Sequence, residues 1–160
     1  MKPKRDLIRE AMESLPHGPE FRFVDRLLSL VPGKSGVGEY KLRGDEYFLR
    51  GHMPGEPIMP GVLLVEAGAQ VAGMVAQNDP LHPNFNGLKL TAMRSVKIFG
   101  SARPGETLHL EATITARLGH LVQARVIASI AGTRVLSAEL TLSGSPNPDA
   151  APEGSVAAAL

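Results

Sequence analysis

The chain has 160 residues, a hydrophobic fraction of 43% and a formal net charge of +1. This length suits one domain with a substantial core, and the near-neutral charge argues against a nucleic-acid partner, which requires clustered positive charge. Cysteine is absent from the sequence, which excludes disulfides, thiolate metal sites and a cysteine nucleophile.

Two segments have the character of helices. The first segment, "MKPKRDLIREAMESL", is too charged for a secretory signal, and its apolar residues recur at helical spacing, which predicts a helix over about 5–15. Residues 58–76 are almost all apolar or small, but Glu66 lies at their middle, where a membrane span would carry a costly charge. We therefore expect a helix over about 60–77, buried inside a cytoplasmic protein that has no membrane association.

The remaining segments predict strands. Residues 21–30 and 36–42 flank the turn "VPGKSG", and three alternating segments follow the second helix: "ETLHLEATITAR", "LVQARVIASI" and, after a tight turn at Ala131-Gly132, "TRVLSAELTL". Only a sheet wrapped around the second helix could cover its apolar circumference, so the fold class is α+β. We expect one domain over 1–142, followed by a disordered Pro/Ala/Gly/Ser-rich tail over 143–160.

The segment "RGHMPGEPIMPGVLLVEAGAQVAG", Arg50 to Gly73, carries the candidate chemistry. A carboxylate on an apolar helix must be paired, be protonated or line a cavity, and Gln70 lies four residues after Glu66, within hydrogen-bonding reach. That pair can also be read as a purely structural one. His52 in the preceding Gly/Pro-rich loop does not by itself indicate catalysis, but His52 and Glu66 together supply a base and an acid for one substrate.

The start of the second helix adds a third element. Pro60 and Gly61 mark the helix start, where free N–H groups from Gly61 onward and the helix dipole can bind a developing oxyanion, and Gly61 has no side chain to keep a ligand away. The sequence predicts no metal site, because the other histidines are dispersed, with no carboxylate or second histidine at ligand spacing. These are His17, His82, His109 and His120.

These motifs occur in a recognisable order. "LPH" with "FVDR", then "GHMPGEPIMPGVLLVEAGAQ", then "RPGETL" resemble the (3R)-hydroxyacyl-acyl-carrier-protein dehydratases of FabZ type over roughly 15–142. The resemblance implies a hotdog fold, in which a curved antiparallel sheet wraps a long central helix. It also implies a homodimer with two shared active sites, in some members gathered into a hexamer.

The resemblance further implies a role for each site residue. His52 would remove the α-proton of the hydroxyacyl thioester, and Glu66 of the other subunit would help to protonate the departing hydroxyl. The Gly61 amide would polarise the thioester carbonyl, with Gln70 in support. The substrate would ride on the phosphopantetheine arm of acyl carrier protein, without metal or organic cofactor. The tunnel wall would include Met53, where the family usually has Phe, together with Pro60 and Val62.

Two other functions fit the residues. In a hotdog thioesterase, the helix carboxylate would activate water against the thioester, and His52 would have no necessary role. In a non-catalytic acyl-binding protein, Glu66 and Gln70 would be only a satisfied pair. The acyl chain length and the pathway, whether fatty acid synthesis or a related polyene or polyketide assembly, stay open.

Overall fold

Six strands form one antiparallel sheet in the order β1-β2-β4-β5-β6-β3. The computed structural model describes residues 2–147 and 149. The strands are β1 (Arg26–Val31), β2 (Ser35–Lys41), β3 (Phe85–Ile98), β4 (Thr107–Leu118), β5 (Leu121–Ile130) and β6 (Thr133–Pro146). The helices are α1 (Lys4–Glu13) and α2 (Gly61–Gln77), with two short 3-10 turns, η1 (Pro19–Phe21) and η2 (Tyr47–Leu49).

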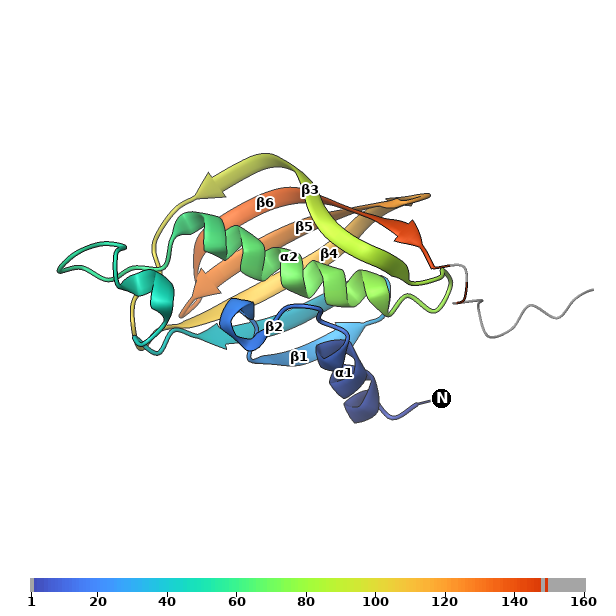
Figure 1. The fold of residues 1–160 in the computed structure, drawn as a ribbon, viewed down its shortest axis with the longest axis horizontal. Coiled ribbons are helices and arrows are strands. Elements are labelled where there is room, and N and C mark those ends of the chain that lie inside the picture. Colours follow the sequence, from blue (N-terminus) through green and yellow to red (C-terminus); the bar gives the residue numbers. More distant parts are fainter. Residues whose placement is uncertain (1, 148, 150–160) are drawn as a thin grey trace, which may run out of the picture.

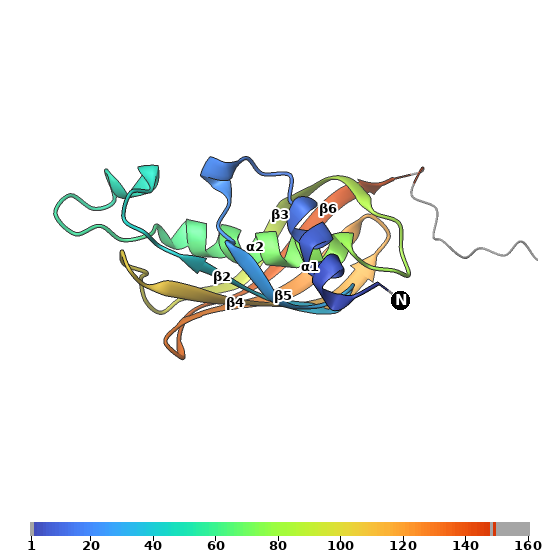
Figure 2. The ribbon, with the colours of Figure 1, turned by 90° about the horizontal axis from the view of Figure 1, so that it is seen from below.

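The sheet curves around α2, which lies across one of its faces (Figures 1 and 2). Eleven of the 17 residues of α2 are buried, as expected of a helix with apolar residues on nearly all sides. This arrangement confirms the expected α+β hotdog fold. The helix begins one residue later than predicted, because Pro60 is its N-cap. Among the helices of the described residues, none has the length and apolarity needed to cross a bilayer.

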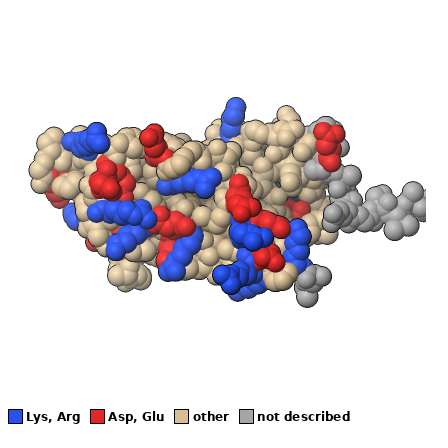
Figure 3. Space-filling model, turned by 60° about the horizontal axis from the view of Figure 1, so that its bottom comes forward, with Lys and Arg blue, Asp and Glu red and all other residues tan. Residues whose placement is uncertain are grey.

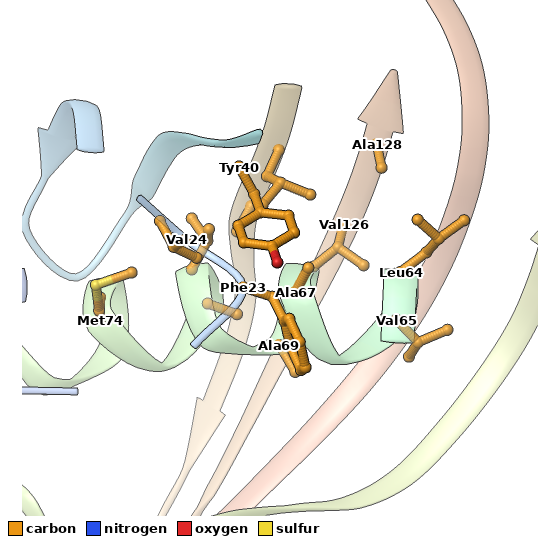
Figure 4. Close-up of a cluster of buried hydrophobic side chains, with 14 of the residues drawn as sticks. Phe23, Val24, Tyr40, Leu64, Val65, Ala67, Ala69, Met74, Val126 and Ala128 are labelled. Carbon is orange, nitrogen blue, oxygen red and sulfur yellow. The ribbon is translucent and has the colours of Figure 1, made fainter. Parts of the chain in front are cut away.

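Small residues bring the helix close to the sheet. A Cβ atom on Gly68 would lie 3.0 Å from the Val126 side chain, and one on Gly36 of β2 would lie 2.7 Å from Val75. Only glycine fits at such a contact without displacing its neighbour. Phe23, Tyr40, Leu64 and Val126 lie in the core around this contact (Figure 4).

Alternation in the last three strands is confirmed. Of the nine residues predicted to face inward on β4 and β5, Ile114 and Ile130 are partly buried and the other seven are at most 2% exposed: Leu108, Leu110, Ala112, Val122, Ala124, Val126 and Ala128. Ala131 and Gly132 join β5 to β6 with φ values of 47° and 80°, the left-handed pair that a two-residue hairpin turn requires.

The structure differs from the prediction in three segments. β1 begins only at Arg26, because residues 19–21 form η1 and the backbone of Phe21 and Phe23 bonds to Gln70 of α2 instead of to a strand. β6 continues into the expected tail, where Ser143 pairs with both Leu121 and Lys89; the residues of that tail at 148 and 150–160 lie outside the described part. β3 is a 14-residue edge strand whose residues from Thr91 onward are exposed.

Candidate functional site

His52 is held by two hydrogen bonds to one residue. Its Nδ1 lies 2.9 Å from the carbonyl oxygen of Ile58, and its own carbonyl accepts from the Ile58 N–H at 2.9 Å. A carbonyl oxygen can only accept, so Nδ1 carries the proton of the neutral ring. Nε2 is then left with a free lone pair, which is the form that a general base needs.

The loop that carries His52 is fixed on both sides. Before it, the Glu46 carboxylate accepts from the N–H groups of Arg43 and Gly44, each at 2.7 Å, and from the Tyr40 hydroxyl at 3.2 Å. Burial alone raises the pKa of Glu46, but these donors lower it below its ordinary value. Burial and the Glu46 charge together raise the pKa of Tyr40. After the loop, the Met59 N–H donates to the carbonyl of Ala102 at 2.9 Å.

The Glu66 side chain contacts two nitrogen groups through one oxygen. Gln70 Nε2 donates to Oε1 at 3.1 Å, as its spacing predicted, and His17 Nε2 lies 3.1 Å from the same atom. Gln70 is 2% exposed, and its amide also bonds the backbone of Phe21 and Phe23. Glu66 keeps 20% of its side chain exposed, so this acid lines a cavity rather than being fully buried.

The sequence predicts no site role for His17, and its contact with Glu66 corrects this prediction. The residue lies 49 positions before Glu66, so spacing along one helix could not indicate the contact. The "LPH" motif that contains His17 contributes to the family resemblance but does not predict this contact. His82 was also dismissed, although its Nδ1 is 2.8 Å from Asp79, three residues earlier. The described residues contain no group of three or more potential metal ligands.

A cavity of about 590 Å³ lies beside Glu66, and we call it the Glu66 pocket. Its walls come from residues 14–17, from α2 between Glu66 and Gln77, and from the first residues of β3. His17 and Gln70 stand beside the carboxylate at the polar end. The rest of the wall includes apolar side chains: Leu15, Met74, Phe85, Leu88, Leu90 and Leu142. The pocket therefore suits a ligand with one polar group and a long apolar part.

The other predicted site residues lie outside this pocket. Gly61 opens α2, where the first N–H groups have no acceptor within the helix, and the Ile98 side chain occupies the space that a Cβ of Gly61 would need. Met53 is 50% exposed and Val62 is 72% exposed. Pro60 is the N-cap residue. In the described chain no hydrogen bond or ion pair joins His52 to Glu66.

Charges are mixed on the surface. Figure 3 shows Lys and Arg side chains interspersed with Asp and Glu over one face of the molecule. Several of these charges form ion pairs, among them Arg43 with Asp25 at 2.8 Å and Arg94 with Glu139 at 3.1 Å. The face in Figure 3 therefore carries no extended field of one sign.

Comparison with known proteins shows the family of this chain. The FabA-like domain matches residues 15–139, which include both His52 and Glu66. The 3-hydroxyacyl-[acyl-carrier-protein] dehydratase FabZ of Chloroflexus aggregans is 36% identical over 137 residues, covering 83% of this chain and 92% of that protein. The enzyme of the same name from Thermoanaerobacter sp. is 39% identical over 126 residues, covering 79% and 88%. The chain belongs to the FabZ-type dehydratases.

Solved structures agree on the fold of this FabZ-type chain. The dehydratase heterocomplex ApeI:P from Xenorhabdus doucetiae superimposes with a TM-score of 0.72 at 16% identity, covering 88% of this chain and 93% of that one. Cj0977, a sigma28-regulated virulence protein from Campylobacter jejuni, gives a TM-score of 0.66 at 10% identity, covering 91% and 93%. At these identities the likeness concerns the hotdog fold alone.

Proposed function

We propose that this FabZ-type enzyme dehydrates (3R)-hydroxyacyl thioesters on acyl carrier protein to trans-2-enoyl thioesters, in fatty acid biosynthesis or a related polyene or polyketide assembly. The observation that carries the mechanism is the 2.9 Å contact between His52 Nδ1 and the Ile58 carbonyl oxygen, because it assigns the ring proton to Nδ1 and leaves Nε2 free. Nε2 takes the proton from C2, and the electron pair of that C–H bond becomes the C2–C3 double bond as the C3–O bond breaks. The departing hydroxyl takes a proton from Glu66 and leaves as water.

Glu66 is arranged for this role by its two neighbours. Gln70 Nε2 and His17 Nε2 both contact Oε1, which leaves Oε2 for the proton and the substrate. His17 Nδ1 is buried and accepts no hydrogen bond from the described residues. A proton there would lack an acceptor, so we place the ring proton on Nε2, where it donates to Glu66. His17 is thus a positioning residue.

The start of α2 stabilises the charge that develops on the thioester oxygen. Removal of the C2 proton moves negative charge to that oxygen, and the free N–H groups of Gly61 and Val62, with the helix dipole, favour it there. A base, an acid and these dipoles supply every step of the reaction. The proposal therefore includes no metal or organic cofactor.

A homodimer completes the site in this proposal. Among the described residues no hydrogen bond or ion pair joins His52 to Glu66 within one chain, and β3 is an edge strand with exposed apolar side chains, including Met93 at 59% and Ile98 at 50%. Pairing of two β3 strands would cover this edge and bring the His52 loop of one protomer to the Glu66 pocket of its partner. Assembly of dimers into a hexamer and a cytoplasmic location are part of the same proposal. Met53, Pro60 and Val62 would then form the mouth of the tunnel.

Product analysis tests the proposed function. The protein is incubated with (3R)-hydroxyacyl chains on acyl carrier protein, and mass spectrometry measures the loss of one water. His52→Ala should lower the rate by roughly 10²–10⁴, the usual contribution of a general base. His120→Ala, which changes an exposed histidine in the β4–β5 turn, should match the wild type.

Two outcomes would contradict the proposal. Release of free acid, undiminished in His52→Ala, would assign a thioesterase, in which the Glu66 carboxylate activates water. Binding of the acyl chain without any conversion would assign an acyl-binding protein in which Glu66 and Gln70 are only a structural pair.

A further inference from the structure

The Glu66 pocket follows one line along α2. Glu66, Gly73 and Gln77 all line it, and they are seven and eleven residues apart. At about 100° per residue these spacings return to within about 20° of the same direction, so the three residues stand on one face of the helix. A ligand whose polar group meets Glu66 and whose apolar part follows α2 therefore passes Gly73 and reaches Gln77.

Gly73 leaves the middle of the pocket open. A Cβ atom there would meet no heavy atom within 4 Å, whereas one on Gly68 would lie 3.0 Å from Val126. Gly73 therefore does not serve the close contact between helix and sheet, as Gly68 does. Glycine inside a helix costs about 0.5–1 kcal/mol relative to alanine. Packing gives no reason for that cost at Gly73, but an open passage does.

A fixed pair of residues, Gln77 and Phe85, forms the pocket wall that lies furthest along α2 from Glu66. The Gln77 side-chain amide makes two hydrogen bonds with the backbone of Phe85, accepting at 2.8 Å and donating at 2.9 Å. The Arg117 guanidinium lies 4.3 Å from the centre of the Phe85 ring and 3.2 Å from the Asp79 carboxylate. Phe85 is 4% exposed. Because these contacts support one another, the wall at Gln77 and Phe85 cannot yield easily to a longer ligand.

We propose that Gly73 and the Gln77–Phe85 pair set the upper length of the acyl chain, an inference that rests on the proposed dehydratase function. Eleven residues at about 1.5 Å per residue separate Glu66 from Gln77 by about 16.5 Å along α2. Subtracting a carbon–carbon contact distance of about 4 Å at this wall leaves a length of about 12 Å for the acyl chain. Bonds of about 1.52 Å at about 111° advance an extended chain by about 1.25 Å per carbon. About ten carbons then fit beyond C3, which limits the substrate to about 12 or 13 carbons.

The test is the chain-length profile of kcat/KM with (3R)-hydroxyacyl chains of increasing length on acyl carrier protein. For the wild type, kcat/KM should fall steeply beyond about 13 carbons. Gly73→Leu blocks the passage about 10.5 Å beyond Glu66. It should lower the ratio of kcat/KM for the 12-carbon chain to that for the 4-carbon chain by at least about tenfold, the effect of forced overpacking. Leu118→Ala is the control, since this residue is 64% exposed in the β4–β5 hairpin, and its profile should equal that of the wild type.

A second variant keeps the test decisive. If Gly73→Leu does not fold, Gly73→Val takes its place, because valine has better helix propensity than glycine and projects into the same space. An unchanged ratio in the folded variant would overturn the role of Gly73, and full activity of the wild type on 16-carbon chains would overturn the limit at Gln77 and Phe85. Dehydration of no chain by the wild type would instead overturn the proposed function.

Discussion

Gln70 connects the site to the core, and its replacement gives a stability prediction. Its oxygen accepts from the Phe23 N–H at 2.9 Å, and its nitrogen donates to the Phe21 carbonyl at 2.8 Å and to Glu66 at 3.1 Å. Gln70→Met keeps the length of the side chain and removes all three hydrogen bonds. Phe23 is 1% exposed, so its N–H becomes a buried donor without an acceptor, which costs about 1–3 kcal/mol. The Phe21 carbonyl and the Glu66 carboxylate are partly accessible to water, and each lost bond there costs about 0.5 kcal/mol.

The expected loss in the free energy of unfolding is therefore about 2–4 kcal/mol. Urea unfolding followed by circular dichroism measures it, and with a slope of about 2 kcal/mol per molar urea the midpoint should fall by about 1–2 M. Gln123→Met is the matched control, because this half-buried glutamine on β5 makes no described side-chain hydrogen bond, and it should change stability by less than about 0.5 kcal/mol. If Gln70→Met unfolds at the wild-type midpoint, the three bonds do not stabilise the fold and the reasoning fails.

Two further predictions concern acid stability and assembly. Burial alone raises the pKa of Asp79, but the Leu81 N–H, His82 and Arg117 lower it below its ordinary 3.8. The ionised Asp79 carboxylate therefore stabilises the fold above about pH 4, and this stabilisation is lost as the pH falls through the lowered pKa that Asp79 has in the folded protein. Asp79→Asn should lower the melting temperature at pH 7 and flatten its decline on acidification below about pH 5; a slope equal to that of the wild type in calorimetry would contradict this. Met93→Asp places a charge on the β3 edge, so light scattering should detect monomers and dehydration should cease; an active monomer would exclude the shared site.

Periodicity predicted most of the fold because burial in this chain follows it closely. The strands β4 and β5 alternate, so each exposes one face to water. The helix α2 is apolar along most of its length and is largely buried. β3 could not be predicted in this way, since Met93, Val96 and Ile98 are exposed in the single chain alongside charged residues. Its pattern reflects two environments at once, the edge of its own sheet and the partner strand that we propose.

The site could be predicted only where its geometry is local. Glu66 and Gln70 are one helical turn apart, so spacing indicated their hydrogen bond, and His52 was identified from its loop and the family motif. The contact of His17 with Glu66 depends on how the segment around η1 packs on α2. No local pattern in the sequence encodes this packing. Gln70 again explains the arrangement, because its bonds to the backbone of Phe21 and Phe23 fix the segment that follows His17.

The same glutamine therefore places both groups that contact Oε1 of Glu66: its own amide directly and His17 through the backbone. A carboxylate held through one oxygen presents the other in a fixed direction, as general acid catalysis requires. In the single chain Glu66, the proposed acid, lines the Glu66 pocket, while His52, the proposed base, lies in a loop outside it. Each half is ordered by its own hydrogen bonds before any substrate arrives. In the dimer that we propose, pairing of the β3 edges needs only to bring these two ordered halves together to build the site.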